Sequence, residues 1–189
     1  MPLATPHAPA RVIETPRLLL RPTSLDDFTR WSELMGDPVA TRFIGGIQPP
    51  ALAWRSLMAM AGAWALTGVA MFSVIEKSSG RWVGRLGPWK PEGWPGTEVG
   101  WSLHPDAWGK GYATEGASAA IDYAFDVLGW DDVIHCIDPL NLPSQQVARR
   151  LGSQLRGAGR LPAPHENASC EIWGQSRAQW RQQKAASRG

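Results

Sequence analysis

The chain lacks the cysteine pattern of a disulfide-stapled or metal-stapled protein. Its 189 residues include two cysteines, Cys136 and Cys170, which form neither a CxxC pair nor a Cys/His ligand motif. Free thiols in a reducing compartment are therefore expected, and Cys136 fits the core of an apolar strand better than a nucleophile. The histidines His104, His135 and His165 also lack the mutual spacing of a ligand set, so no metal site is expected.

Long apolar runs and a strong charge imbalance are missing as well. No uninterrupted apolar stretch approaches the roughly 20 residues that span a bilayer, and residues 1–10 lack the basic start and apolar run of a signal peptide. The formal net charge of +2 is too small for a dedicated nucleic-acid-binding or membrane-binding protein. We therefore expect a cytoplasmic protein with no membrane or nucleic-acid partner.

Basic residues near the C-terminus offer one competing interpretation, a nucleic-acid-binding segment. They are Arg177, Arg181, Lys184 and Arg188. No aromatic–basic interleaving accompanies them, so a solvated helix face explains these charges better.

The chain does contain enough apolar residues for one ordinary domain. Hydrophobic residues make up 43% of the sequence, and a domain of this size buries about 70% of its unfolded surface. Eleven tryptophans stand against two tyrosines and four phenylalanines, an excess that fits the core and subunit contacts of a homodimer. We expect a flexible N-terminal tail over residues 1–12, a single domain over 13–182 and a polar C-terminal tail over 183–189.

Apolar periodicity predicts alternating groups of strands and helices. Strands are expected at 17–22, 69–76, 81–86, 97–103, 133–137 and about 170–173, and helices at 24–35, 50–66, 110–128, 142–151 and in the basic tail. The segment 87–96 is dense in Gly, Pro and Trp and is expected to be a loop. Strands and helices in this order, with a final hairpin, indicate an α+β fold.

Two helices carry more specific expectations about which side chains are buried. In helix 50–66, one face is expected to hold Trp54, Leu57, Met58, Ala61, Trp64 and Ala65, and Gly68 is expected to end the helix. In the helix that begins near residue 110, a largely alanine stripe predicts close packing against a sheet.

The stretch from Trp108 to Thr114 has the features of an anion site at a helix start. Gly109 and Gly111 let a ligand approach the main chain closely. The helix behind them leaves its first amides without helical acceptors, and its dipole favours an anion by roughly 0.3–1 kcal/mol. Lys110 adds a positive charge.

Other phosphate-binding motifs fit this stretch less well. A Walker loop needs Lys after the second Gly, whereas Lys110 precedes Gly111. A dinucleotide fingerprint needs Gly where Thr114 stands and a parallel βαβ unit, whereas three antiparallel strands are predicted before the loop. From the motif alone, a glycine-rich helix start without any ligand stays open as an alternative.

Four motifs follow one another along the chain. They are Glu14-Thr15-Pro16-Arg17-Leu18-Leu19-Leu20-Arg21, Glu98-Val99-Gly100-Trp101-Ser102-Leu103, Trp108-Gly109-Lys110-Gly111-Tyr112-Ala113-Thr114-Glu115, and Asn141-Leu142-Pro143-Ser144 with Val147 and Leu151-Gly152. Together, over residues 14–179, they resemble the GNAT acetyltransferase superfamily, in particular the branch of ribosomal-protein N-terminal acetyltransferases. Trp108 replaces the polar residue that opens the family's loop motif, which matters little where main-chain amides bind the ligand.

The resemblance implies a mostly antiparallel mixed sheet of six to seven strands, splayed in the middle, with helices on both faces. It also implies acetyl-CoA as co-substrate, with its pyrophosphate at the loop and its pantetheine arm beside the splayed strand. The implied coenzyme contacts are Trp101, Ser102, Leu103, Trp108, Gly109, Lys110, Gly111, Tyr112, Ala113, Thr114, Asn141 and Ser144. Asn141 is also expected to cap its helix, and capping alone remains an alternative.

Acetyl transfer to an amine requires a base, oxyanion stabilisation and an acid for the leaving thiolate. Glu98 is the candidate base, with a solvated strand-edge charge as the alternative. Many GNAT enzymes place a tyrosine acid where this chain has Ala148, so the branch implies Ser144 instead, with helix support as the alternative. Glu115 is expected to complement the helix dipole or orient the loop.

The sequence therefore predicts an N-acetyltransferase acting on a primary amine, either a peptide N-terminus or a small molecule, by direct attack in a ternary complex. Trp89, Trp94, Glu98 and Trp101 are the candidate acceptor-pocket residues, because rigid rings form walls at low entropic cost. The vacant tyrosine position keeps a second hypothesis open, a catalytically weak sensor of acyl-CoA.

Overall fold

The computed structural model describes residues 12–186, so most of the expected N-terminal tail lies outside the described residues, whereas residues 183–186 of the expected C-terminal tail belong to the last helix. The strands are β1 (Ile13–Glu14), β2 (Leu18–Arg21), β3 (Phe72–Glu76), β4 (Arg81–Trp89), β5 (Glu98–Leu103), β6 (Asp132–Ile137), β7 (Gln154–Gly159) and β8 (Cys170–Ser176). The helices are α1 (Phe28–Gly36), α2 (Pro50–Thr67), α3 (Tyr112–Asp126), α4 (Leu142–Arg150) and α5 (Arg177–Ala186), with 3-10 turns at Leu25–Asp27 and Pro105–Ala107. This element order confirms the predicted α+β class.

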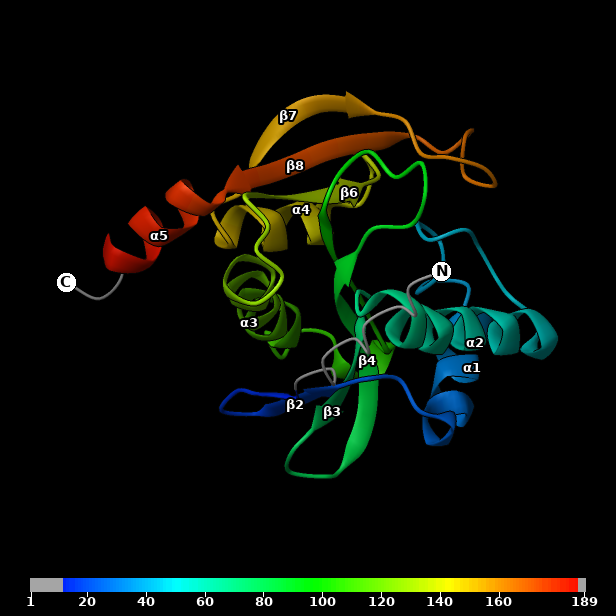
Figure 1. Cartoon of the computed structure of the whole chain (residues 1–189). Helices are drawn as coiled ribbons and strands as arrows, with labels where there is room; N and C mark the ends of the chain where they lie inside the picture. Colours follow the sequence, from blue (N-terminus) through cyan, green and yellow to red (C-terminus); the bar gives the residue numbers. More distant parts are fainter. Residues whose placement is uncertain (1–11, 187–189) are drawn as a thin grey trace, which may run out of the picture.

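The strands form one mixed sheet in the order β1-β2-β3-β4-β5-β6-β8-β7. It has eight strands rather than six or seven, because the two-residue β1 pairs with β2 and was too short to give a periodic signal. Only β5 and β6 run parallel. Figure 1 shows that α1 and α2 lie on one side of the sheet and α3 and α4 on the other.

The sheet is splayed between β5 and β6. Along its other edge β5 pairs with β4 at six positions, from Gly84↔Leu103 to Trp89↔Glu98. With β6 it has one pair, Glu98↔Ile134. The strands therefore separate beyond Glu98, as the family resemblance implies.

Helix α3 packs closely on the sheet, as its alanine stripe predicts. Ala117, Ala120 and Ala124 are fully buried. At Gly116 an added Cβ would lie 2.5 Å from Leu86 Cδ2, so only glycine fits this contact. The close approach fixes where the N-terminus of α3 meets the splayed strands.

Two expectations about local structure need correction. In α2 the buried residues are Ala53, Leu57, Met60 and Trp64, whereas Trp54 and Met58 remain 41% and 38% exposed. This helix carries one charged residue, Arg55, so its apolar pattern does not select a face. Its end at Gly68, with φ of 69°, is as predicted.

The second correction concerns segment 87–96, which begins as strand rather than loop. Residues 87–89 continue β4, because they pair with residues 98–100 of β5. The loop proper therefore begins at Lys90, and Trp89 is a strand residue.

No helix among the described residues has both the length and the apolar character needed to cross a membrane.

Candidate active site

The splay is stabilised where the parallel ladder stops. The Ile134 amide donates to the Thr97 carbonyl at 2.9 Å, and a regular ladder would next join the Cys136 amide to the Val99 carbonyl. Instead, the Cys136 amide donates to Glu98 Oε1 at 3.1 Å. The Val99 carbonyl accepts from His135 Nδ1 at 2.6 Å. Two side chains thus satisfy the main-chain groups that the splay separates.

Glu98 is a buried carboxyl at the base of the split, not a solvated edge charge. Its side chain is 6% exposed, and Oε2 accepts from Trp94 Nε1 at 2.6 Å. Burial raises its pKa to about 7, and the hydrogen bonds from Cys136 and Trp94 oppose that rise only in part. A carboxyl with this pKa can take up and release a proton near neutral pH, as a general base must.

His135 fills the opposite face of the split as a neutral imidazole. It is 1% exposed, and burial lowers its pKa to about 4. Because a carbonyl can only accept, Nδ1 carries the proton and Nε2 lies 2.9 Å from Ser153 Oγ. Sequence reasoning placed His135 in a strand without a role, and no local pattern indicated that it would replace a ladder bond.

The predicted acceptor-pocket residues divide between the two faces of β5. Glu98 and its partner Trp89 point to the α1–α2 face, where the Trp94 indole also meets the Glu98 carboxyl. Side chains alternate along a strand, so Trp101 points to the α3–α4 face. The structure therefore groups Trp89, Trp94 and Glu98 and separates Trp101 from them.

On the α3–α4 face, Trp101 meets the start of α4. Its Nε1 donates to Ser144 Oγ at 3.3 Å, and its ring lies 4.8 Å from that of His135 between centroids. Asn141 caps α4, since its side chain accepts from the Ser144 amide. Ser144 thus lies across the split from Glu98, one on each face of the sheet.

The predicted phosphate cradle has the backbone geometry of an anion site. Gly109 and Gly111 have φ of 74° and 77°, a region that favours glycine. The first bond of α3 runs from the Glu115 amide to the Gly111 carbonyl at 3.1 Å. The amides of Tyr112, Ala113 and Thr114 therefore have no carbonyl one turn earlier in the helix. These amides and the helix dipole fit a phosphate group.

Glu115 holds the cradle to the β1–β2 turn, consistent with an orienting role. Its carboxylate accepts from Thr15 Oγ1 at 2.6 Å, from the Arg17 amide at 2.9 Å and from Arg17 Nε at 2.6 Å. Arg17 also donates to the Lys110 carbonyl at 2.8 Å. Arg17 was not a predicted site residue, although it lies in the first family motif. Its guanidinium brings positive charge close to Gly111: a Cβ atom built on that glycine would lie 3.5 Å from Arg17 Nη2.

Other predicted coenzyme contacts already have protein partners. The Leu103 carbonyl accepts from Trp108 Nε1 at 2.8 Å, and Ser102 pairs with Arg85 of β4. Lys110 Nζ lies 3.4 Å from Glu76 Oε1, which also accepts from the Tyr112 hydroxyl. Trp101 lies beyond the last β5–β6 pair, and alternation along the strand directs its main-chain amide and carbonyl toward the split, as it does for Thr97 and Val99.

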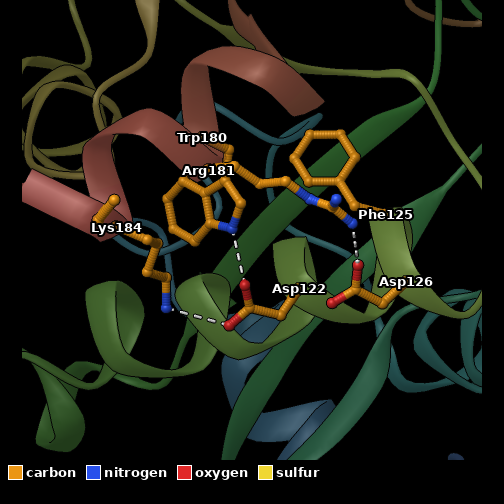
Figure 2. Close-up of a pocket in the computed structure, with 7 residues that line it drawn as sticks. Asp122, Phe125, Asp126, Trp180, Arg181 and Lys184 are labelled. Atoms are coloured by element: carbon orange, nitrogen blue, oxygen red, sulfur yellow. Dashed lines mark hydrogen bonds and ion pairs between the residues drawn. The ribbon is translucent and has the colours of Figure 1, made fainter.

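Two surface hollows lie outside the split. One, of about 240 Å³, is lined by Asp122, Phe125, Asp126, Trp180, Arg181, Lys184 and Ala185. Figure 2 shows that its polar groups bind one another: Asp122 accepts from Trp180 and Lys184, and Asp126 pairs with Arg181. These contacts join α5 to α3, so the charges of Arg181 and Lys184 have acidic partners within the protein. Arg188 lies outside the described residues.

The second hollow, of about 390 Å³, follows the β7–β8 hairpin. Its lining includes neither Glu98 nor Ser144. Within residues 12–186, no three His, Cys, Asp or Glu side chains gather as metal ligands would.

Comparisons with known proteins agree with this geometry. The sequence model of the acetyltransferase (GNAT) domain matches residues 17–154. The uncharacterized N-acetyltransferase p20 of Bacillus licheniformis is 31% identical over 147 residues, covering 76% of this chain and 82% of that protein. An acetyltransferase structure from Agrobacterium tumefaciens superposes with a TM-score of 0.78 at 26% identity, covering 88% of this chain and 95% of that one.

A ribosomal-protein-S5-alanine acetyltransferase from Vibrio fischeri shares the fold at 16% identity, with a TM-score of 0.68 and coverage of 90% and 98% of the two chains. The splayed mixed sheet, the cradle and these similarities define the class of the protein, an acyl-CoA-dependent acetyltransferase. The chain belongs to the GNAT acetyltransferase family, whose members use acetyl-CoA.

Proposed function

We propose that the protein transfers the acetyl group of acetyl-CoA directly to a primary amine in a ternary complex, with Glu98 as general base and Ser144 as acid. The observation that carries the proposal is the placement of these two groups on opposite faces of the splay. A buried carboxyl with a pKa near 7 lies on one face, and a hydroxyl lies on the other. An acetyl group between them would have a base on its acceptor side and an acid on its thiolate side.

The residues present fit the coenzyme. Amides of residues 112–114 and the positive charge of Arg17 suit a pyrophosphate at the cradle. The main chain of Trp101, which has no β6 partner, suits an extended pantetheine arm, as when a peptide adds to a sheet edge. Asn141 and Ser144 border the same face. Bound there, acetyl-CoA supplies an activated acyl group as a thioester.

The chemistry of the step can be balanced with the groups present. The neutral amine attacks the acyl carbon as its proton passes to the Glu98 carboxylate, forming the C–N bond. The C–S bond then breaks, and the thiolate takes up a proton through Ser144, directly or by water. Both the amine and the leaving group thus have a partner on their own side of the sheet.

The acceptor is a peptide N-terminus or a small-molecule amine. The shared fold with an acetyltransferase named for a ribosomal-protein alanine supports the first class. Trp89 and Trp94 beside Glu98 supply the rigid walls that either class would contact.

Thermal unfolding with and without acetyl-CoA provides the first test. Ligand at about 100 times its Kd stabilises a protein by roughly 2.7 kcal/mol, which for a chain of this length raises Tm by about 5–10 °C. An unchanged Tm at saturating acetyl-CoA would refute the cofactor site.

Thiol release with a panel of amines and N-terminal peptides then distinguishes transfer from sensing. The sensor hypothesis rests on Ala148, a fully buried alanine at the position where many family members carry a tyrosine acid. Acetyl-CoA binding without thiol release for any amine would favour the sensor.

A further inference from the structure

Arg85 is a cation on the acceptor face of the sheet that contacts an aromatic ring but has no acidic partner among the described residues. Its Nε is buried and has no hydrogen-bond partner, and no ion pair joins its guanidinium to any residue in 12–186. Burial alone lowers its pKa to about 10, so the side chain remains charged at neutral pH. An unpaired buried charge is costly, whereas an anion that binds it recovers much of that cost.

The acid that contacts the cross-strand neighbour of Arg85 already has other partners. Arg85 pairs with Ser73 across β3–β4, and Ser73 donates to Asp27 Oδ2 at 2.6 Å. Asp27 also accepts two bonds from Arg21 and one from the Ser24 amide. Its lone pairs are therefore committed, and Arg85 lacks the carboxylate partner that Arg21 has.

The guanidinium is positioned by a fixed aromatic ring. Arg85 Cζ lies 4.7 Å from the centroid of Trp31, which is fully buried. Trp31 Nε1 donates to Ser56 Oγ at 2.9 Å, which sets the plane of the ring. A cation stacked on an aromatic face keeps its N–H groups free in the guanidinium plane, as bidentate binding of a carboxylate requires.

Arg85 and Glu98 share one face of the sheet. Arg85 is paired with Ser102 and Glu98 with Trp89, so four strand positions, about 13 Å, separate them. Between them Gly87 opposes Gly100, and two side chains cover these glycines: the Phe72 ring lies over Gly87 and the Met71 methyl over Gly100, so a ligand in this span has to displace them. A dipeptide about 7 Å long plus an extended arginine side chain can bridge that span.

We propose that Arg85 binds an anionic group of the acceptor, so that the substrate is a compact amine that also carries a carboxylate. The inference rests on the proposed acetyl transfer and narrows its acceptor class. Glu98 receives the amine proton at one end, and the guanidinium holds the carboxylate at the other. Arg85 then determines specificity without touching the reacting atoms.

The test uses two probes that differ only in the anion, alanyl-alanine and its C-terminal amide. The wild type should show kcat/KM about 10-fold or more higher for the acid, mainly through KM, since a charged hydrogen bond contributes on that scale. In Arg85→Gln the ratio of acid to amide should fall to about one, and Arg85→Lys should restore part of it. Arg55→Gln, which removes an exposed charge from α2, should leave the ratio unchanged.

A binding measurement separates this inference from the proposed function. With saturating coenzyme A, the acid should raise the Tm of the wild type and the amide should raise it less, whereas Arg85→Gln should lose the difference. If that pattern appears without acetylation of either probe, Arg85 binds the carboxylate and the proposed acetyl transfer fails. If the acid and the amide raise the Tm of the folded wild type equally, Arg85 does not bind the carboxylate, whether or not acetylation occurs.

Discussion

The two faces of the splay are built in different ways. On the α3–α4 face, the candidate coenzyme site consists mainly of main-chain amides at a helix start and a helix cap at Asn141. On the α1–α2 face, the candidate acceptor site consists of ionisable side chains, the buried Glu98 and the partly buried Arg85. Main-chain sites tolerate side-chain change, whereas buried charges depend on every neighbour. We therefore expect coenzyme binding and acceptor chemistry to respond to different mutations.

Glu98→Gln should have the largest effect. The amide cannot accept the amine proton, so kcat/KM at neutral pH should fall about 10²–10⁴-fold while acetyl-CoA affinity stays unchanged. In the wild type the rate should rise as pH increases through about 7, because the deprotonated carboxylate is the base. Steady-state kinetics from pH 5.5 to 9 would measure both effects.

The control for Glu98 is Glu92→Gln, which changes an exposed glutamate in the loop that precedes β5. A peptide amine titrates near pH 8 and should still do so in both variants. If the rate of Glu98→Gln still rises as pH increases through about 7, Glu98 is not the general base.

Gly111→Asp should affect only the coenzyme face. A carboxylate beside the amides of α3 would compete with the pyrophosphate, so acetyl-CoA affinity should fall about 10–100-fold, or 1.4–2.7 kcal/mol. Calorimetric titration with acetyl-CoA measures this loss. Gly129→Asp is a matched control, because Gly129 has φ of 72° and open space around it after the end of α3. Equal affinity in the two variants would contradict the cradle.

Ser144→Ala should produce a smaller loss, about 5–10-fold in kcat, the scale of one hydrogen bond. The Kd for acetyl-CoA should change little, since the Trp101 indole and the Asn141 cap remain. Thiol release under saturating acetyl-CoA reports kcat directly. An unaltered kcat would leave Ser144 with helix support alone.

In the wild type the smallest predicted effect is the net pH dependence of stability, because the two buried groups His135 and Glu98 oppose each other. His135 has a folded pKa below its usual value, so its stabilisation is complete above about pH 6.5 and is lost as pH falls toward 4. Glu98 has a folded pKa above its usual value, so its contribution is complete below about pH 4.5 and is lost as pH rises toward 7. Over most of this range the two trends cancel.

Glu98→Gln should therefore reveal the contribution of His135. Relative to wild type, the variant should gain up to about 3 kcal/mol of unfolding free energy between pH 4.5 and 7. Urea unfolding at pH 5 and pH 7 measures the difference. A gap between the two proteins that does not change with pH would show that burial leaves the Glu98 pKa near its ordinary value.

The parts of the site that local sequence specifies were predictable. The glycine pair at 109 and 111, the cap at Asn141 and the strand containing Glu98 follow from residue type and spacing, and the structure confirms their local conformations. The end of α2 at Gly68 belongs to the same group. By contrast, the prediction of which face of α2 is buried was wrong, because in a helix that is apolar on all sides the neighbouring elements decide which face they cover.

Sequence by itself thus determined the element order, the α+β class and the helix start that fits a phosphate, because these depend on periodicity and on residues a few positions apart. Tertiary structure alone decided that β5 and β6 separate after one pair, that His135 and Glu98 satisfy the groups left by that separation, and that Arg85 stacks on Trp31 without an acid. Desolvation and pairing depend on atoms from distant segments, and no local pattern encodes them.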